Sequence, residues 1–360
     1  MLVSIRQDIF SNPNNDSQLD DLLTFFKKGK HQLNLNDPDD FLAFDDSTWK
    51  ESLKGDNLKL ILRGLKSSRF VKKIIISDNI ANLEENFSLE EAYLFLDKPL
   101  QILVEHNEYD EPFYFAIIKN FDFSNILLNS FQNGWLEFDH GGGSTIESVV
   151  RNSLKKNGKT SPYFVKPLEK YLRYYVIKDS DKEFCRIQPD GSIVQQELAV
   201  SKTNFFIDNN VPFHYLYKRE KENYIPDSVF EYFMHDNAKK KYAESYLKLN
   251  NHQKDFLDIE KGFSHYDRKE KVKTLKDRNQ LEENVKELYK KVGDKDYEVI
   301  GFGFSDSFSS LKTKFSLEFN NLSKEQMLSR IKHQPLIISE LDGEERNEFD
   351  HIINEIKRLL

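Results

Sequence analysis

The segment Leu100–Glu105 has the sequence LQILVE, a short and almost entirely apolar run that ends in an acid. Such runs are typical of strands buried on both faces of a parallel sheet. Three similar runs follow it: Gly134–Phe138, Arg173–Lys178 (RYYVIK) and Val211–Tyr217 (VPFHYLY). Helical patterns separate them, so residues 98–226 are predicted to form an α/β domain with a Rossmann-like, mostly parallel sheet and helices on both faces.

The segments between these strands carry apolar residues at helical spacing. Residues 113–131 and residues 193–207 are each predicted to be helical, and Ser144 is expected to cap another helix. The apolar face of that third helix repeats every three or four residues, at Ile146, Val149, Val150 and Leu154. Chemistry in a sheet of this kind gathers beyond the carboxyl ends of the strands.

Residues 1–97 are predicted to form an N-terminal α+β extension, which could be a sensor, a unit that docks a partner, or part of the same fold. Leu58–Leu65 and Phe70–Ile76 are dense in Ile, Val and Leu, which favours strands. Ser88 begins a capping-box pattern that predicts the start of a helix.

After Pro226 the apolar runs fade, and residues 227–360 are predicted to be mainly helical. Residues 228–250 and 266–291 are strongly charged with helical periodicity, and Tyr297–Phe319 is less regular. A helix is expected at the end, over Arg346–Leu360.

Composition excludes several classes of protein. The 360 residues are 38% hydrophobic and 31% charged, a balance typical of folded globular chains. No apolar run approaches the ~18 residues that span a bilayer, and Met1–Asn12 has no signal-peptide pattern. The single cysteine, Cys185, excludes an intramolecular disulfide, so a cytoplasmic location is expected. The net charge of −8 argues against a protein that coats nucleic acid, but it allows a local basic groove.

Acids follow two of the predicted strands directly. Glu105 ends the first run, and Asp179 and Asp181 come directly after the third. Because the carboxyl ends of parallel strands meet at one edge of a sheet, these carboxylates are expected to converge. Oxygen ligands of this kind suit Mg²⁺ or Mn²⁺, and such ions can activate water against a phosphodiester.

Further polar residues accompany these acids. Asp110 comes shortly after Glu105, and Glu222 follows the fourth predicted strand, so both are candidate metal ligands. Lys218 and Arg219 follow that same strand and could steady a substrate phosphate; the alternative is that they balance the charge of nearby acids. A helix N-terminus also attracts acids for electrostatic reasons alone, which would account for Asp110 without a metal.

Three segments together resemble a known domain. ILVEHNEYDEPF (Ile102–Phe113) resembles the first motif of TOPRIM domains, and VIKDSDKE (Val176–Glu183) resembles their Asp-x-Asp motif. HYLYKREKENYIP (His214–Pro226) is similar to the segment that follows in nucleases related to the OLD family and in bacterial phage-defence TOPRIM effectors. The resemblance covers about a third of the chain.

The resemblance implies a metal-dependent nuclease that hydrolyses DNA or RNA and serves as the effector of an anti-phage defence system. It implies that Glu105 binds metal and transfers protons, and that Asp179 and Asp181 bind metal. Asp110 matches the acid one turn after the glutamate, although its spacing is wider than usual. His106 stands where many TOPRIM domains have glycine. Both departures bear on Asp110 more than on Glu105.

The same residues also fit two further classes of protein. Primases and topoisomerases share the TOPRIM core and also transfer phosphoryl groups. A non-catalytic binding or regulatory module could instead dock a partner through its acids. The sequence contains no G-x-x-x-x-G-K-[ST] loop, so an ATPase of the OLD type would have to be a separate partner. A nuclease also requires restraint, so a regulatory partner or a homo-oligomer is expected.

Some features carry weaker signals. Gly141–Gly143 could cradle a phosphate with backbone N–H groups, or could form a strand-to-helix turn that requires positive φ. His106 and His140 are not predicted to form a structural zinc site, because the chain has one cysteine and scattered histidines. The basic run Lys239–Lys241 is predicted to lie on a solvated helix face.

Overall fold

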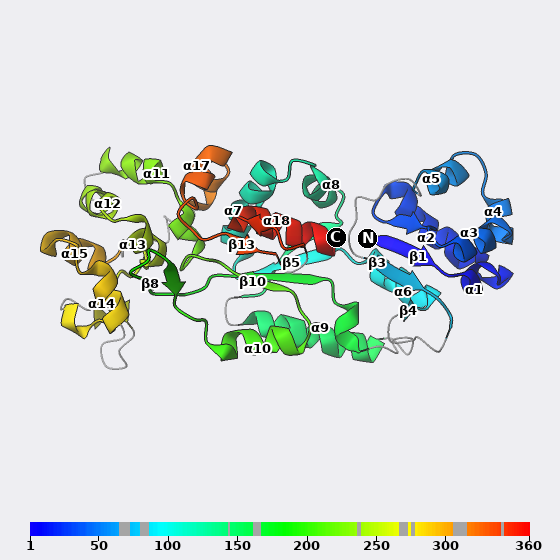
Figure 1. The fold of residues 1–360 in the computed structure, drawn as a ribbon, viewed down its shortest axis with the longest axis horizontal. Helices are drawn as coiled ribbons and strands as arrows, with labels where there is room; N and C mark the ends of the chain where they lie inside the picture. Colours follow the sequence, from blue (N-terminus) through cyan, green and yellow to red (C-terminus); the bar gives the residue numbers. More distant parts are fainter. Residues whose placement is uncertain are drawn as a thin grey trace.

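The computed structural model describes residues 1–64, 73–79, 86–142, 145–160, 167–235, 239–265, 273–274, 278–304, 315–339 and 342–360. Three parts follow one another along the long axis: an N-terminal unit, a central α/β core, and a region of short helices (Figure 1). The chain then returns to the core, so the two ends lie side by side, and the Met1 amino group donates a hydrogen bond to the Leu360 carbonyl at 3.0 Å.

The central sheet has four parallel strands, as predicted. They are β5 (Leu100–Val104), β6 (Leu136–His140), β7 (Tyr174–Lys178) and β10 (Phe213–Tyr215), in the order β10-β7-β5-β6. The β5 and β7 strands are therefore neighbours at the centre of the sheet, and β10 lies at one edge. The strand order places the ends of β5, β7 and β10 next to one another.

Helices cover both faces of this sheet, which confirms the predicted layering (Figure 1). Side chains alternate along β5: Ile102 and Val104 pack in one core, and Leu103 packs in the other. Full burial of such a side chain contributes roughly 1.5–3 kcal/mol. One face carries α7 (Asn107–Phe121), α8 (Ile126–Gln132) and α18 (Glu348–Leu359), and the other carries α9 (Ile146–Thr160) and α10 (Val200–Asp208).

The N-terminal unit contains a second parallel sheet, which differs from the predicted α+β extension. Its strands are β1 (Leu2–Ile5), β2 (Gln32–Asn34), β3 (Lys73–Ile76) and β4 (Asn86–Phe87), in the order β2-β1-β3-β4. Strands joined by helices pair in parallel, so the unit has α/β character. The helices are α1 (Gln7–Phe10), α2 (Asp16–Lys28), α3 (Pro38–Asp45), α4 (Thr48–Ser52), α5 (Asp56–Gly64) and α6 (Leu89–Asp97).

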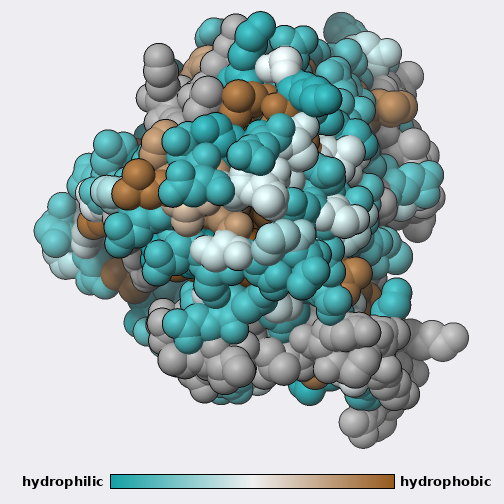
Figure 2. All heavy atoms as spheres, turned by 90° about the vertical axis from the view of Figure 1, so that its right-hand side faces the viewer, coloured by the Kyte–Doolittle hydropathy of each residue, from teal (hydrophilic) through white to brown (hydrophobic). Residues whose placement is uncertain are grey.

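One predicted strand of this unit is wrong and one predicted helix start is confirmed. The segment from Leu58 to Gly64 lies within α5; Leu65, at the end of the predicted strand, is outside the described residues. Ser88 caps α6 with a reciprocal pair of hydrogen bonds to Glu91, of 3.2 and 2.9 Å. Seen from this end, the molecule is covered mainly by hydrophilic residues, with hydrophobic ones in small groups (Figure 2).

The region after the core is mainly helical in its described residues. Its helices are α11 (Asp227–Tyr232), α12 (Lys240–Leu247), α13 (Asn251–Phe256), α14 (Glu283–Tyr289), α15 (Asp294–Gly301) and α17 (Lys324–Ser329). Two short antiparallel pairs accompany them: β11 (Ser264–His265) with β12 (Lys273–Thr274), and β13 (Ile337–Ile338) with β14 (Glu345–Arg346). A further pair, β8 (Cys185–Ile187) with β9 (Ile193–Gln195), occupies the start of the predicted 193–207 helix, which in fact begins at Val200 as α10.

The last helix, α18, belongs to the central core rather than to the helical region that precedes it. It packs against α7 and α8, and Phe349 contacts Phe113 and Phe121 at ring-centroid distances of 6.1 and 5.2 Å. None of the helices that the structure describes is long and apolar enough to cross a membrane.

Candidate functional site

The predicted acids converge at the carboxyl edge of the central sheet. Glu105 follows β5 directly and Asp179 follows β7 directly, and these two strands are paired. The short 3-10 helix η5 (Lys221–Tyr224) comes shortly after β10, the other neighbour of β7. Three successive strand ends therefore deliver charged residues to one place, as the sequence predicted.

Burial and neighbouring acids both act on the carboxyl groups of Glu105 and Asp179. Burial raises the pKa of Glu105, and the charges of Asp181 and Asp110 raise it further, while Lys178 opposes them from 3.7 Å. Burial also raises the pKa of Asp179 well above its usual range, with Glu105 and Glu222 adding to the rise and Lys221 opposing it. A cation placed between Glu105 and Asp179 would relieve this repulsion.

Asp181 lies at the exposed rim of the site. Its backbone adopts a left-handed conformation, with φ of 54°, which aspartate tolerates better than most residues. The Asp181 N–H donates to the Arg219 carbonyl at 3.0 Å, which fixes this turn against the segment after β10. The Asp181 carboxylate is 58% exposed and pairs with the ammonium of Lys202, on α10, at 3.1 Å.

Lys221 is the residue that the sequence analysis missed. Its ammonium is buried and lies 2.7 Å from Asp110 Oδ1 and 3.1 Å from Glu222 Oε1. Its backbone N–H donates to Asp179 Oδ1 at 3.0 Å. Burial alone would lower the pKa of Lys221, but Glu222, Asp110 and Asp179 outweigh it, and the net pKa lies well above the usual range. Lys221 thus supplies a fixed positive charge beneath the site.

The contacts of Lys221 change the roles predicted for Asp110 and Glu222. Asp110 accepts a hydrogen bond from the His106 backbone at 2.7 Å with one oxygen and faces Lys221 with the other. Glu222 is 2% exposed and faces the same ammonium. In this arrangement both carboxylates hold Lys221 in place, whereas Glu105, Asp179 and Asp181 remain the acids nearest the surface.

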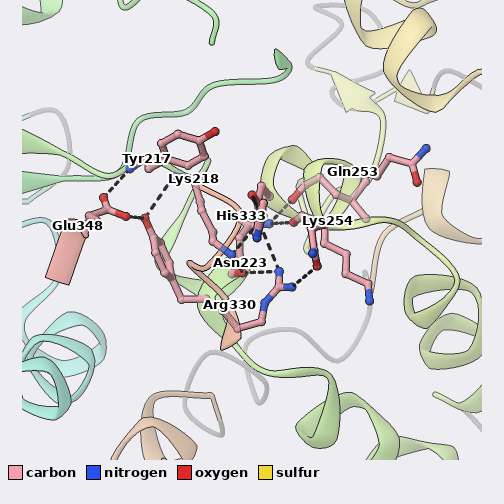
Figure 3. A network of polar contacts seen from close by, with 12 residues as sticks. Tyr217, Lys218, Asn223, Gln253, Lys254, Arg330, His333 and Glu348 are labelled. Carbon is pink, nitrogen blue, oxygen red and sulfur yellow. Dashed lines mark hydrogen bonds and ion pairs between the residues drawn. The ribbon is translucent and has the colours of Figure 1, made fainter. Parts of the chain in front are cut away.

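Lys218 does not join the acidic site, and its predicted contact with a phosphate is corrected. Its side chain is 0% exposed, and its ammonium lies 2.7 Å from Asp255 and donates to the Asn223 carbonyl at 3.0 Å. Arg330 contacts the same carboxylate and the same carbonyl, at 3.4 and 3.1 Å (Figure 3). Burial lowers the pKa of Lys218 to about 7, although Asp255 acts in the opposite direction. A substrate phosphate cannot reach this ammonium.

The remaining candidates are resolved in part. Arg219 pairs with Asp258 at 3.1 Å and with Glu183 at 3.8 Å, which supports charge balance as its role. Gly142 has a φ of 58°, as a strand-to-helix turn requires, while Gly143 and Ser144 lie outside the described residues. The His106 and His140 rings stack at the same edge of the sheet, with centroids 5.7 Å apart.

The carboxylates at this edge suit a hard divalent cation, although their oxygen atoms do not lie close enough together to surround one in this structure. Among the described residues, the group whose ligand atoms all lie within 4.8 Å of one another is His252, Asp255 and His333, away from this edge. Carboxylate oxygens are the ligands that Mg²⁺ and Mn²⁺ prefer. The convergence of the partly exposed Glu105 and Asp179 at the ends of paired strands provides the observation that such a cation fits.

Comparisons with protein-family models, with curated proteins and with solved structures found no match to this chain. The fold and the site therefore define its class on their own: an α/β protein with a cluster of carboxylates at the carboxyl edge of a parallel sheet.

Proposed function

We propose that the chain is a metal-dependent nuclease of the TOPRIM type, which hydrolyses phosphodiester bonds of DNA or RNA at the carboxyl edge of its central sheet. The observation that carries the proposal is the meeting of Glu105 and Asp179 at the ends of neighbouring strands, where burial, and to a lesser extent the charges of nearby acids, raise their pKa values. The motif resemblance over residues 102–226 supports the same activity.

Glu105 and Asp179 would hold Mg²⁺ or Mn²⁺, with Asp181 as a further ligand at the rim. The ion would supply Lewis-acid stabilisation of the phosphate oxygens. The Asp179 carboxylate is already oriented by the Lys221 backbone N–H, so it is held toward the site before any ligand arrives. Such preorganisation is what an electrostatic site requires.

Glu105 is the proposed general base. Its carboxylate is partly exposed at the end of β5, beside Asp179 on β7, where it would accept a proton from the attacking water. Lys202 takes the role that the sequence suggested for Lys218. Its ammonium lies at the exposed rim beside Asp181, where an incoming phosphate would meet it.

One observation favours the alternative of a non-catalytic binding module. The ammonium of Lys221 already neutralises part of the charge of Asp110 and Glu222, as an internal cation would. In that alternative, the edge acids dock a basic partner and bind no metal. The roles of anti-phage effector, and of a separate regulatory partner or ATPase, rest on the resemblance and belong to the nuclease proposal.

A cleavage assay tests the proposal. The substrates are plasmid DNA, single-stranded DNA and total cellular RNA including tRNA, each with Mg²⁺, with Mn²⁺ and with EDTA. Wild type is compared with Asp179→Asn, Glu105→Gln and Lys202→Met. Glu137→Gln is the matched control, because Glu137 is an exposed glutamate on β6 of the same sheet.

We expect metal-dependent cutting that falls at least about 100-fold in Asp179→Asn and Glu105→Gln, since removing a general base costs roughly 10²–10⁴-fold. Lys202→Met should lose less, and Glu137→Gln should cut like wild type. Cutting that survives in Asp179→Asn and Glu105→Gln would move the activity away from this edge. No cutting and no metal binding by the wild type would favour the binding module.

A further inference from the structure

Two histidines and an aspartate meet in a second place, where Asp255 also pairs with the buried Lys218. His252 and Asp255 lie three residues apart on α13, so they share one face of that helix. His333 comes from the turn after α17 and brings its Nε2 atom 2.5 Å from Asp255 Oδ2. One ligand atom from each of the three residues lies within 4.8 Å of the others. The site therefore joins two segments that are far apart in sequence.

The ring nitrogens of this group are incompletely satisfied. The Nδ1 atoms of both His252 and His333 are buried and have no hydrogen-bond partner among the described residues. Buried polar atoms rarely lack a partner, and a bound ion is one way in which such atoms are satisfied. The two rings also lie edge to face, with centroids 5.3 Å apart.

The two oxygens of Asp255 face different surroundings. Oδ1 lies 2.7 Å from the Lys218 ammonium and 3.4 Å from the Arg330 guanidinium, and Oδ2 faces His333. These cations fix the carboxylate in place as outer contacts do in known metal sites. Their positive charges also offset the negative charge of the Asp255 carboxylate, so this carboxylate should bind a metal ion less tightly than one without such partners.

The chemistry of the three donors favours a transition-metal ion. Two imidazoles and one carboxylate suit zinc, which is held by three protein ligands and a water in its open sites. Mg²⁺ and Ca²⁺ prefer sites built from oxygen alone. The His333 side chain is 16% exposed, so a cation from solvent can reach the group.

We propose that His252, Asp255 and His333 bind one Zn²⁺, with the fourth position open to water. The ion would connect α13 to the turn after α17, and thereby support Asp255 and the network that joins Lys218 to Asn223 of η5 and Asn223 to α13 (Figure 3). This site is separate from the acidic edge and does not depend on the nuclease proposal.

Titration calorimetry with Zn²⁺ on the full chain, freed of metal with EDTA and dialysed, tests the proposal. Wild type is compared with His252→Ala, His333→Ala, His106→Ala and Asp179→Asn. Asp255 is left intact, because its loss would leave Lys218 and Arg330 buried without their carboxylate. Co²⁺ is a second probe, since its visible absorption reports tetrahedral coordination by the same ligands.

We expect a Zn²⁺ site in the wild-type chain whose Kd rises at least about tenfold in His252→Ala and His333→Ala, because even outer-shell losses cost roughly 10–100-fold. The His106→Ala and Asp179→Asn variants should keep this site with an unchanged Kd; a second Zn²⁺ held by the acidic edge would be lost in Asp179→Asn, because carboxylates that hold Mn²⁺ also hold Zn²⁺. Far-UV circular dichroism in EDTA checks folding, and if His333→Ala fails to fold, His252→Ala decides. No binding by wild type, unchanged binding in His252→Ala, or loss confined to Asp179→Asn would each overturn the proposal.

Discussion

Replacing Glu348 by alanine should weaken the attachment of the last helix to the central core. Glu348 is 3% exposed at the start of α18, and its carboxylate accepts three hydrogen bonds. The donors are the Tyr217 backbone at 2.7 Å, the Tyr224 hydroxyl at 2.6 Å and His214 Nε2 at 3.0 Å. These donors flank the segment that places Lys221 in the acidic site, so Glu348 connects α18 to that segment.

The magnitude follows from these three bonds. In Glu348→Ala, the Tyr217 N–H and the Tyr224 hydroxyl are left buried without acceptors, each at a cost of about 1–3 kcal/mol. The His214 bond is partly exposed and adds less. We therefore expect the free energy of unfolding to fall by about 3–5 kcal/mol. In Glu348→Gln the amide oxygen still accepts, so the loss should be about 1–2 kcal/mol.

Urea unfolding followed by tryptophan fluorescence measures this loss. The chain has two tryptophans, Trp49 in the N-terminal unit and Trp135 directly before β6. A Trp49→Phe background leaves Trp135 to report the central core alone. The control is Glu355→Ala on the same helix, whose partly exposed pair with Arg358 should contribute less than about 1 kcal/mol. A loss below about 1 kcal/mol in Glu348→Ala would refute the reasoning.

Two further predictions concern other parts of the chain. Asp122 accepts from Lys357 at 2.7 Å and has a lowered pKa, because Lys357 and neighbouring donors outweigh its burial. The stabilisation from Asp122 is therefore present above the unfolded pKa of about 3.9 and is lost as the pH falls through the folded value. Asp122→Asn should therefore make the urea midpoint depend less on pH between about pH 5 and pH 2. An unchanged pH dependence of the midpoint in this range would contradict the prediction. Gly262 has a φ of 61°, and a Cβ there would lie 2.3 Å from the Ile300 carbonyl oxygen. Gly262→Ala should cost more than about 2 kcal/mol by urea unfolding, while Gly191→Ala, which has positive φ but open space, should cost about 1 kcal/mol; equal losses would show that the close contact does not matter.

The central sheet was predictable because its strands are short apolar runs between helical patterns. The convergence of Glu105 and Asp179 followed from the rule that the ends of parallel strands share one edge. The order β10-β7-β5-β6 did not follow from the sequence, because strand pairing is a long-range property. The helix α5 was predicted as a strand, since a short run of Leu and Ile has no periodicity that separates the two.

The sequence predicted which acidic residues lie in the site better than it predicted which basic residues do. Lys218 and Lys221 lie three residues apart in one charged segment, and only the backbone path after β10 decides which ammonium reaches the acids. Lys218 is buried against Asp255, a residue from the helical region that sequence patterns do not link to it. The positive φ of Gly142 agrees with the turn, one of the two alternatives for the glycine run, because glycine is the residue that adopts positive φ at least cost.

The most direct test of the central claim is calorimetric titration of Mn²⁺ into the His252→Ala protein, with and without Asp179→Asn. The His252→Ala background removes the second proposed metal site, so any binding reports the acidic edge. The account predicts that Mn²⁺ binds the His252→Ala protein and that adding Asp179→Asn abolishes the binding. The urea midpoint should change little on adding Asp179→Asn, which shows that the protein is still folded. Two results would contradict the claim that Glu105 and Asp179 form a metal site: Mn²⁺ binding that persists when Asp179→Asn is added, or no Mn²⁺ binding by the His252→Ala protein itself.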